Sequence, residues 1–295
     1  MRPRLLLNLL LLLGIGVLGT WFWLQPASEQ DRPESISPLN INAVQHLRIE
    51  RPDQPTIELE RRNRDWRVIA PLRADAEDSR VESILLLPLS ASAGQFPASD
   101  ANLEEFGLEP PQLTITYDSE TFVVGDTSPL DEERRYVLYD DEIHLFDARL
   151  YQRLNAPLNY YINPSLTPTD SELTGIRLPG GQIRKDDGDW RAEPDNLTHT
   201  PAITADAWQR TRASYVKQHE NNDAEYDQSV SLEFAGQDPI RYRVVATDPQ
   251  IILARPEQGL QYHLPAELLL DLGLTTGKTA DTNDAGEYRT STDEP

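Results

Sequence analysis

Asp65-Trp66-Arg67-Val68-Ile69-Ala70-Pro71 is the stretch that decides how the chain is read, because its first three residues return at Asp189-Trp190-Arg191. In the first copy, apolar and polar residues alternate, which is typical of a strand with one buried face. An acidic helix start, further short strands and a closing helix are expected after each copy. We therefore expect one α+β unit that is used twice, each copy an antiparallel sheet with a packed helix.

The first unit is predicted over residues 44–158. A helix is expected to begin at 75–79, where Asp75 can cap it and the acidic first turn complements the helix dipole. A short helix at 148–155 closes the unit. Strands are expected around 47–49, 57–59, 66–68, 113–117, 121–124, 135–139 and 142–146.

The second unit is predicted over residues 173–274, after a proline-containing connection at 159–172. Gly180-Gly181 and Asp187-Gly188 are typical of two-residue hairpin turns. The expected helices are 204–218 and 265–272, and the later strands are 230–234, 240–246, 251–254 and 260–263.

An N-terminal transmembrane helix is predicted within residues 1–24. Residues 5–24 carry no charge, and at about 1.5 Å per residue they would span about 30 Å. Arg2 and Arg4 precede this segment and Trp21, Phe22 and Trp23 end it, so we expect a single-pass bacterial inner-membrane protein with a periplasmic C-terminal domain. The alternative is a cleaved signal peptide, which the Gln25-Pro26-Ala27 sequence fits poorly.

Two further segments are predicted to lack a packed structure. Residues 25–43 contain spaced prolines among polar residues and read as an extended linker. Residues 275–295 are polar without an apolar period and read as a disordered tail.

The composition excludes several classes of function. With 27 basic and 49 acidic residues, the formal net charge is −22, which disfavours binding to nucleic acid or to anionic lipid. There is no cysteine, so the chain has no disulfide, no thiolate metal site and no cysteine nucleophile.

No pattern in the sequence carries recognisable chemistry, so we predict no catalytic, cofactor-binding or metal-binding residue. The histidines show no metal-ligand spacing, and the carboxylate runs fall at a helix start and at turns, where solvated charge is the usual state. The histidines are His46, His144, His199, His219 and His263. The carboxylate runs are Asp75, Glu77 and Asp78; Asp131, Glu132 and Glu133; and Asp140, Asp141 and Glu142.

Two other features have a structural and a functional interpretation. Trp66 and Trp190 could line a carbohydrate or peptide groove, but a tryptophan on an alternating strand more often packs in the core. A hairpin turn is favoured over a functional tripeptide motif for Gly180-Gly181-Gln182. A turn is likewise favoured over a calcium-binding loop for Asp186-Asp187-Gly188-Asp189.

Several short motifs resemble a bacterial family of unknown function, often encoded beside gliding-motility-type ABC transporter components. The resemblance spans about residues 44–272 and implies an N-terminal membrane span, a repeated extracytoplasmic domain and no known catalytic residue. The motifs are Trp66 to Pro71, Ala74-Asp75, Val81 with Leu85-Leu86-Leu87, Phe106-Gly107-Leu108-Glu109-Pro110-Pro111, Val124-Gly125-Asp126 and Arg135-Tyr136-Val137.

Three hypotheses of function remain open. The first is a membrane-anchored periplasmic binding or scaffold module, an accessory subunit of an ABC-type transport or envelope system. Its partner would be an ABC-type permease or a companion membrane subunit, reached through a sheet edge or face. The second is a hydrolase that acts on envelope polymer, and the third is a purely structural envelope protein. A deep pocket with converging carboxylates or a histidine would favour the enzyme, and a broad apolar or sheet-edge surface would favour the module.

Overall fold

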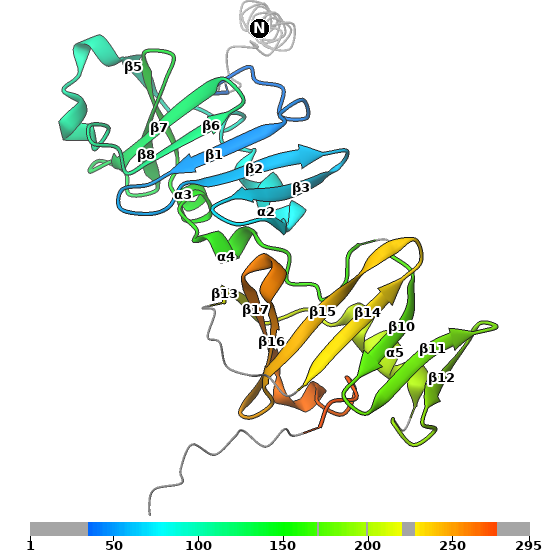
Figure 1. Cartoon of the computed structure of the whole chain (residues 1–295). Coiled ribbons are helices and arrows are strands. Elements are labelled where there is room, and N and C mark those ends of the chain that lie inside the picture. The colour runs from blue at the N-terminus through cyan, green and yellow to red at the C-terminus, as the bar shows by residue number, and fades with distance from the viewer. Residues whose placement is uncertain (1–34, 170, 199, 220–227, 276–295) are drawn as a thin grey trace, which may run out of the picture. The chain divides into compact units, whose positions relative to one another are not determined.

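The computed structural model describes residues 35–169, 171–198, 200–219 and 228–275. These residues form two antiparallel sheets, of nine and eight strands (Figure 1). By its internal contacts the chain divides into two compact units. Of the described residues, one unit holds 35–42, 85–112 and 122–151, and the other holds 43–84, 113–121 and those between 152 and 275.

The nine-stranded sheet has the order β4-β3-β2-β1-β6-β7-β8-β9-β5. Buried and exposed side chains alternate along its strands. On β1, for example, Leu47 and Ile49 are buried and the residue between them is exposed, so one face of the sheet is buried. The strands are β1 (His46–Glu50), β2 (Ile57–Arg62), β3 (Asp65–Ala70), β4 (Ala74–Asp75), β5 (Gln95–Pro97), β6 (Leu113–Tyr117), β7 (Glu120–Thr127), β8 (Arg134–Tyr139) and β9 (Glu142–Asp147).

The eight-stranded sheet has the order β12-β11-β10-β14-β15-β16-β17-β13. Every neighbouring pair in it is antiparallel. Its strands are β10 (Leu173–Leu178), β11 (Gly181–Asp186), β12 (Asp189–Glu193), β13 (Tyr215–Gln218), β14 (Ser229–Phe234), β15 (Gln237–Ala246), β16 (Gln250–Arg255) and β17 (Leu260–Pro265).

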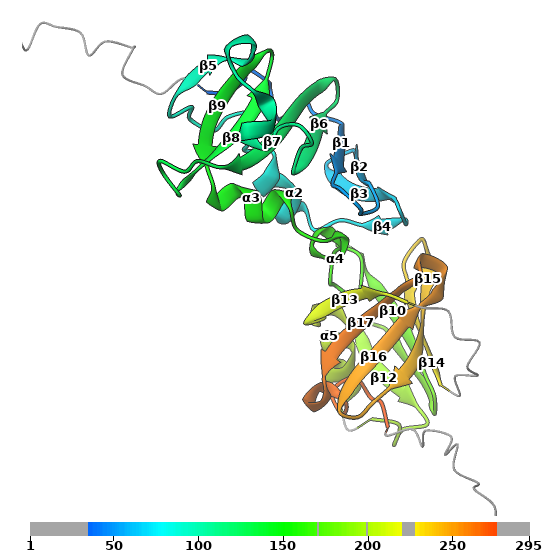
Figure 2. The ribbon, with the colours of Figure 1, turned by 90° about the vertical axis from the view of Figure 1, so that its left-hand side faces the viewer.

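One face of the eight-stranded sheet packs against helix α5 (Pro201–Arg210). The buried Trp208 of this helix lies with its ring centroid 6.1 Å from that of Tyr242, and its Nε1 donates a hydrogen bond to the carbonyl of Leu272 at 3.0 Å. In Figure 2, α5 lies against one side of this sheet. The core therefore lies on the α5 side, and the other face of the sheet points away from it.

The expected α+β architecture is wrong, because the described fold is mostly antiparallel sheet with few and short helices. The expected pair of similar helix-packed units is replaced by sheets of nine and eight strands. The other α-helices are α2 (Asp78–Ile84), α3 (Arg149–Leu154) and α4 (Leu158–Tyr161). The 3₁₀ turns are Ala98–Asp100, Leu103–Phe106, Pro256–Gln258 and Ala266–Leu268.

Three helix predictions are too long for identifiable reasons. The helix expected over 204–218 ends at Arg210, and Tyr215–Gln218 instead forms the edge strand β13, whose backbone pairs with β17. The helix expected from 75 begins at Asp78, because Ala74–Asp75 pairs with β3 as β4. The helix expected over 265–272 is a single 3₁₀ turn, and the chain reaches a left-handed glycine at Gly273.

The predicted transmembrane segment, 5–24, lies outside the described residues, as do residues 25–34 of the linker and 276–295 of the tail. Across the described ranges, no helix is long and apolar enough to cross a membrane. The expectation of a single-pass inner-membrane protein with a periplasmic domain therefore finds no support in the structure and is corrected here. The predicted domain boundaries stay a prediction.

Candidate functional site

The carboxylates at the start of α2 are engaged in holding the fold. Asp75 lies 3.3 Å from Arg67, and Glu77 forms an ion pair with Arg212. Asp78 Oδ1 accepts the backbone N–H of Trp66 at 2.8 Å. Burial raises the pKa of Asp78, an effect that this hydrogen bond opposes. Asp75 and Asp78 line a polar hollow, but both already have partners, so they do not form a free acid/base pair.

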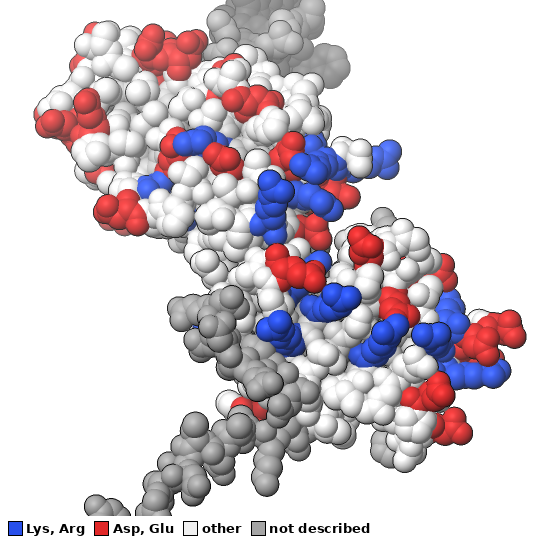
Figure 3. Space-filling view, in the orientation of Figure 1, with Lys and Arg blue, Asp and Glu red and all other residues white. Residues whose placement is uncertain are grey.

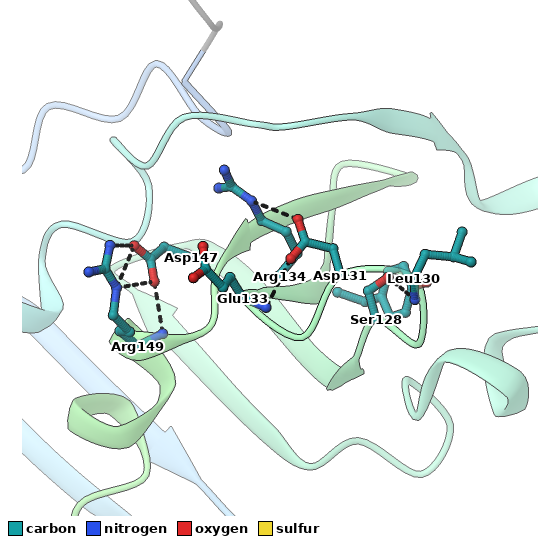
Figure 4. Close-up of polar contacts among 8 residues, drawn as sticks. Ser128, Leu130, Asp131, Glu133, Arg134, Asp147 and Arg149 are labelled. Atoms are coloured by element: carbon teal, nitrogen blue, oxygen red, sulfur yellow. Dashed lines mark hydrogen bonds and ion pairs between the residues drawn. The ribbon is translucent and has the colours of Figure 1, made fainter.

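The acidic run at 131–133 lies in the β7–β8 loop (Figure 4). Asp131 Oδ1 accepts the backbone N–H of Glu133 at 3.0 Å, and its Oδ2 lies 3.7 Å from Arg134 Nε. Nearby, Asp147 faces Arg149, whose hydrogen bonds lower the pKa of that carboxyl to about 2. Asp147 is therefore ionised at neutral pH and cannot act as a general acid. No group of histidines and carboxylates in the described part of the chain is arranged to hold a metal ion.

The histidines have structural contacts. His144 is buried with its Nδ1 3.1 Å from Ser92 Oγ, and burial lowers its pKa. His263 stacks on Tyr215 with ring centroids 4.3 Å apart, and its Nε2 lies 3.0 Å from Gln261 Nε2. Burial, and then the charge of Lys217, lower the pKa of His263. His46 is exposed on β1, His219 is buried beside Gln261, and His199 lies outside the described residues.

The two repeated tryptophans occupy different environments. Trp66 is 1% exposed on β3, so its prediction as a core residue is confirmed. Trp190 is only half-buried on β12. The turn predicted at Asp187-Gly188 is confirmed, whereas the one predicted at Gly180-Gly181 lies one residue earlier: Pro179 and Gly180 form it, and Gly181 is the first residue of β11, opposite Leu178. Asp187 and Gly188 join β11 to β12 with φ of 48° and 95°, the left-handed pair that a two-residue type I′ hairpin requires.

The outward face of the eight-stranded sheet is the feature that the sequence reasoning missed. Residues directly opposite each other in an antiparallel pair point to the same face. Arg191 is opposite Arg184, and Arg184 is opposite Gly175. Two residues along β10, Arg177 is opposite Ser231, which is opposite Arg241. These pairings place five exposed arginines, Arg177, Arg184, Arg191, Arg241 and Arg243, on one side, and we call this surface the arginine face.

The contacts on the arginine face leave part of its charge without a partner. Arg177 Nη2 lies 2.8 Å from Glu233 Oε1, and Arg191 Nη1 lies 3.3 Å from Asp186. In contrast, Arg184 and Arg241 make no hydrogen bond or ion pair with any residue that the structure describes. Figure 3 shows basic side chains spread across this sheet with acidic ones among them, in a chain of net charge −22.

A shallow groove of about 540 Å³ runs over the centre of the arginine face. Arg177 and Arg241 flank it, and Ser229 and Ser231 lie between them. Glu233 also lines the groove, and it sits over Gly175, where an added Cβ would lie 2.9 Å from its Oε2. The groove is therefore polar, with guanidinium groups and hydroxyls that suit a negatively charged ligand.

A family model described as a domain of unknown function, DUF4340, matches residues 66–231, from β3 into β14. No curated protein and no solved structure matches the chain. The match covers more than half of the sequence, begins at Trp66 of the first Asp-Trp-Arg stretch and includes all of the second. The chain therefore belongs to the DUF4340 family.

Proposed function

We propose that this chain is a scaffold module that binds a partner protein, and that the partner is an ABC-type permease or a companion subunit of one. The observation that carries the proposal is the arginine face, a broad and polar sheet surface that no described helix covers. Such a face offers many weak contacts rather than one reactive centre, as expected of a docking surface.

The side chains that could have supported catalysis favour the same proposal. Asp75, Asp78 and Asp147 each have a structural partner, and His144 and His263 have lowered pKa values because of burial. Asp75 and Asp78 line one hollow, but no described histidine lines it with them, whereas acid/base catalysis needs groups that converge on one reacting atom.

The choice of partner rests on the resemblance to proteins encoded beside ABC transporter components. The sequence contains no phosphate-binding glycine loop, so energy for any transport step would come from another chain. A scaffold that docks on the permease of such a system fits both observations.

In-cell photo-crosslinking tests this proposal. A photoreactive amino acid replaces Ser229, which is exposed on the arginine face, and in a matched control it replaces Ile203, which is 56% exposed on α5. We expect the Ser229 position to capture a permease or companion subunit and the Ile203 position to capture none. If both positions capture the same proteins, or if neither captures a transporter component, the proposal fails. Equal melting temperatures would show that both variants are folded.

A further inference from the structure

We propose that the arginine face binds an extended acidic peptide segment of a partner protein, with carboxylates of the segment paired to Arg184 and Arg241. This inference rests on the proposed function as a docking module. It adds the charge of the partner's segment. The net charge of −22 would by itself predict a basic partner, whereas the arginine face favours an acidic one.

A carboxylate already occupies part of the face. Glu233 reaches Arg177 at 2.8 Å and lies between the positions of Arg184 and Arg241 in the sheet. Gly175 leaves the room for it, because a side chain at that position would meet the Glu233 carboxylate. The fold thus contains one example of the interaction that the two unpartnered arginines can repeat, and a guanidinium is the cation best shaped to hold a carboxylate through two hydrogen bonds.

The pairing of Arg184 with Arg191 is a second indication. The two side chains are directly opposite each other on neighbouring strands, where like charges destabilise a sheet. A glutamate at either position would relieve the repulsion. Features that weaken the local structure are expected where a surface serves binding, and an incoming carboxylate would remove this repulsion.

The spacing of the two unpartnered arginines indicates the length of the segment. Arg184 on β11 and Arg241 on β15 are separated by β10 and β14, which makes three strand spacings of about 4.8 Å, or about 14 Å. An extended peptide advances about 3.4 Å per residue, so carboxylates four residues apart match this separation. The flexible arginine side chains adjust for the offset along the strands.

The charge around the face favours a short segment over a long polyanion. Asp186, Asp189 and Glu193 lie at the β11–β12 end of the same face, and the whole chain is strongly acidic. A nucleic acid or a sulfated polysaccharide would bring many more negative charges than the face can neutralise. A peptide with two carboxylates would meet mainly the unpartnered arginines.

Fluorescence anisotropy with the purified full-length protein tests the inference. The probe is a labelled peptide with two glutamates four residues apart, and the matched probe has glutamines there. The variant Arg184→Ala/Arg241→Ala removes the two unpartnered charges. The control Arg64→Ala/Arg153→Ala makes the same charge change at exposed positions of the β2–β3 turn and of α3.

We expect the glutamate peptide to bind about tenfold more weakly to the Arg184→Ala/Arg241→Ala variant than to the wild type or the control, because the variant loses two exposed ion pairs with the peptide, each of modest strength. Binding should weaken as salt is raised. Equal binding of the glutamate and glutamine peptides, or equal losses in the two variants, would overturn the inference. So would tighter binding of duplex DNA than of the acidic peptide.

The two proposals fail separately. If crosslinking at Ser229 still captures a transporter component in the Arg184→Ala/Arg241→Ala background, the docking function stands and the acidic segment is refuted. If peptide binding behaves as expected but no transporter component is captured in cells, the arginine face is a real binding surface and the proposed partner is wrong.

Discussion

The two Asp-Trp-Arg stretches fold as strands in different sheets and have opposite surroundings. On β3, Trp66 is fully buried, and Arg67 is opposite Glu60 and 3.3 Å from Asp75. On β12, Trp190 is half-buried and Arg191 is opposite Arg184. The same tripeptide therefore places its arginine opposite a glutamate in one sheet and opposite a second arginine in the other, where Arg191 also lies 3.3 Å from Asp186. What a strand presents to a partner depends on the strand beside it.

The neighbouring strands supply the difference. On the outward face of the nine-stranded sheet, Arg48 lies 2.6 Å from Glu58, and Arg62 lies 2.8 Å from Glu60. Acidic and basic groups alternate there, and Figure 3 shows red and blue side chains mixed over that part of the sheet. The corresponding positions on β11 and β14 are occupied largely by arginine, glutamine and serine, which leaves the arginine face only partly neutralised.

The largest expected effect separates the two tryptophans. Trp66→Ala should lower the free energy of unfolding by about 3–5 kcal/mol, because a fully buried aromatic side chain is lost. Trp190→Ala should cost clearly less, because part of its surface is already in water. Urea denaturation of the two variants measures the contrast, and equal losses would refute the assignment of Trp66 alone to the core.

The next effect concerns Asp78, which accepts the backbone N–H of Trp66. Asp78→Ala should cost about 1–3 kcal/mol, since the N–H loses its acceptor in a partly buried place. Asp78→Asn keeps an acceptor oxygen and should cost less. Equal losses in urea denaturation would show that the charge, and not the hydrogen bond, is what stabilises β3.

Asp78 also predicts a pH dependence. Burial raises its pKa in the folded state, so the folded chain binds this proton more tightly than the unfolded chain does. The contribution of Asp78 to stability should therefore fall as pH rises from the ordinary value of 3.8 through the raised folded value. Melting curves of the wild type and Asp78→Asn, recorded across that window, should converge at its acidic end. If the difference in melting temperature between the two proteins instead grew toward low pH, the predicted direction of the pH dependence would be wrong.

The smallest effects exchange the charges of the two faces. Arg184→Glu places an opposite charge across from Arg191 and should stabilise the sheet by about 0.2–1 kcal/mol, while it abolishes the tighter binding of the acidic peptide. Glu60→Arg creates a like-charge pair with Arg67 and should destabilise by a similar amount. Thermal melting and the peptide assay together measure both outcomes. If Arg184→Glu and Glu60→Arg both stabilised the protein, the charge difference between the two sheet faces would be refuted.

Most strands could be predicted from the sequence because alternation is a local signal. The runs around Leu47, Ile115 and Leu232 each bury every second residue, and all three are strands. The helices were overestimated, because Tyr215–Gln218 pairs with β17, a strand more than forty residues away, and no local pattern records that pairing. The arginine face was missed for the same reason. Arg184 and Arg241 are separated by more than fifty residues, and only the register brings them to one face.

Gly175 has a consequence for any ligand of the arginine face. Because it lets Glu233 lie against Arg177, the face carries its own tethered competitor, whose effective concentration at Arg177 exceeds that of any free peptide. An incoming carboxylate at Arg177 must therefore displace an intramolecular one, whereas Arg184 and Arg241 accept it without competition. The tethered Glu233 therefore makes Arg177 the least accessible of these three arginines to an outside carboxylate, and it leaves Arg184 and Arg241 as the places where such a group meets no intramolecular competitor.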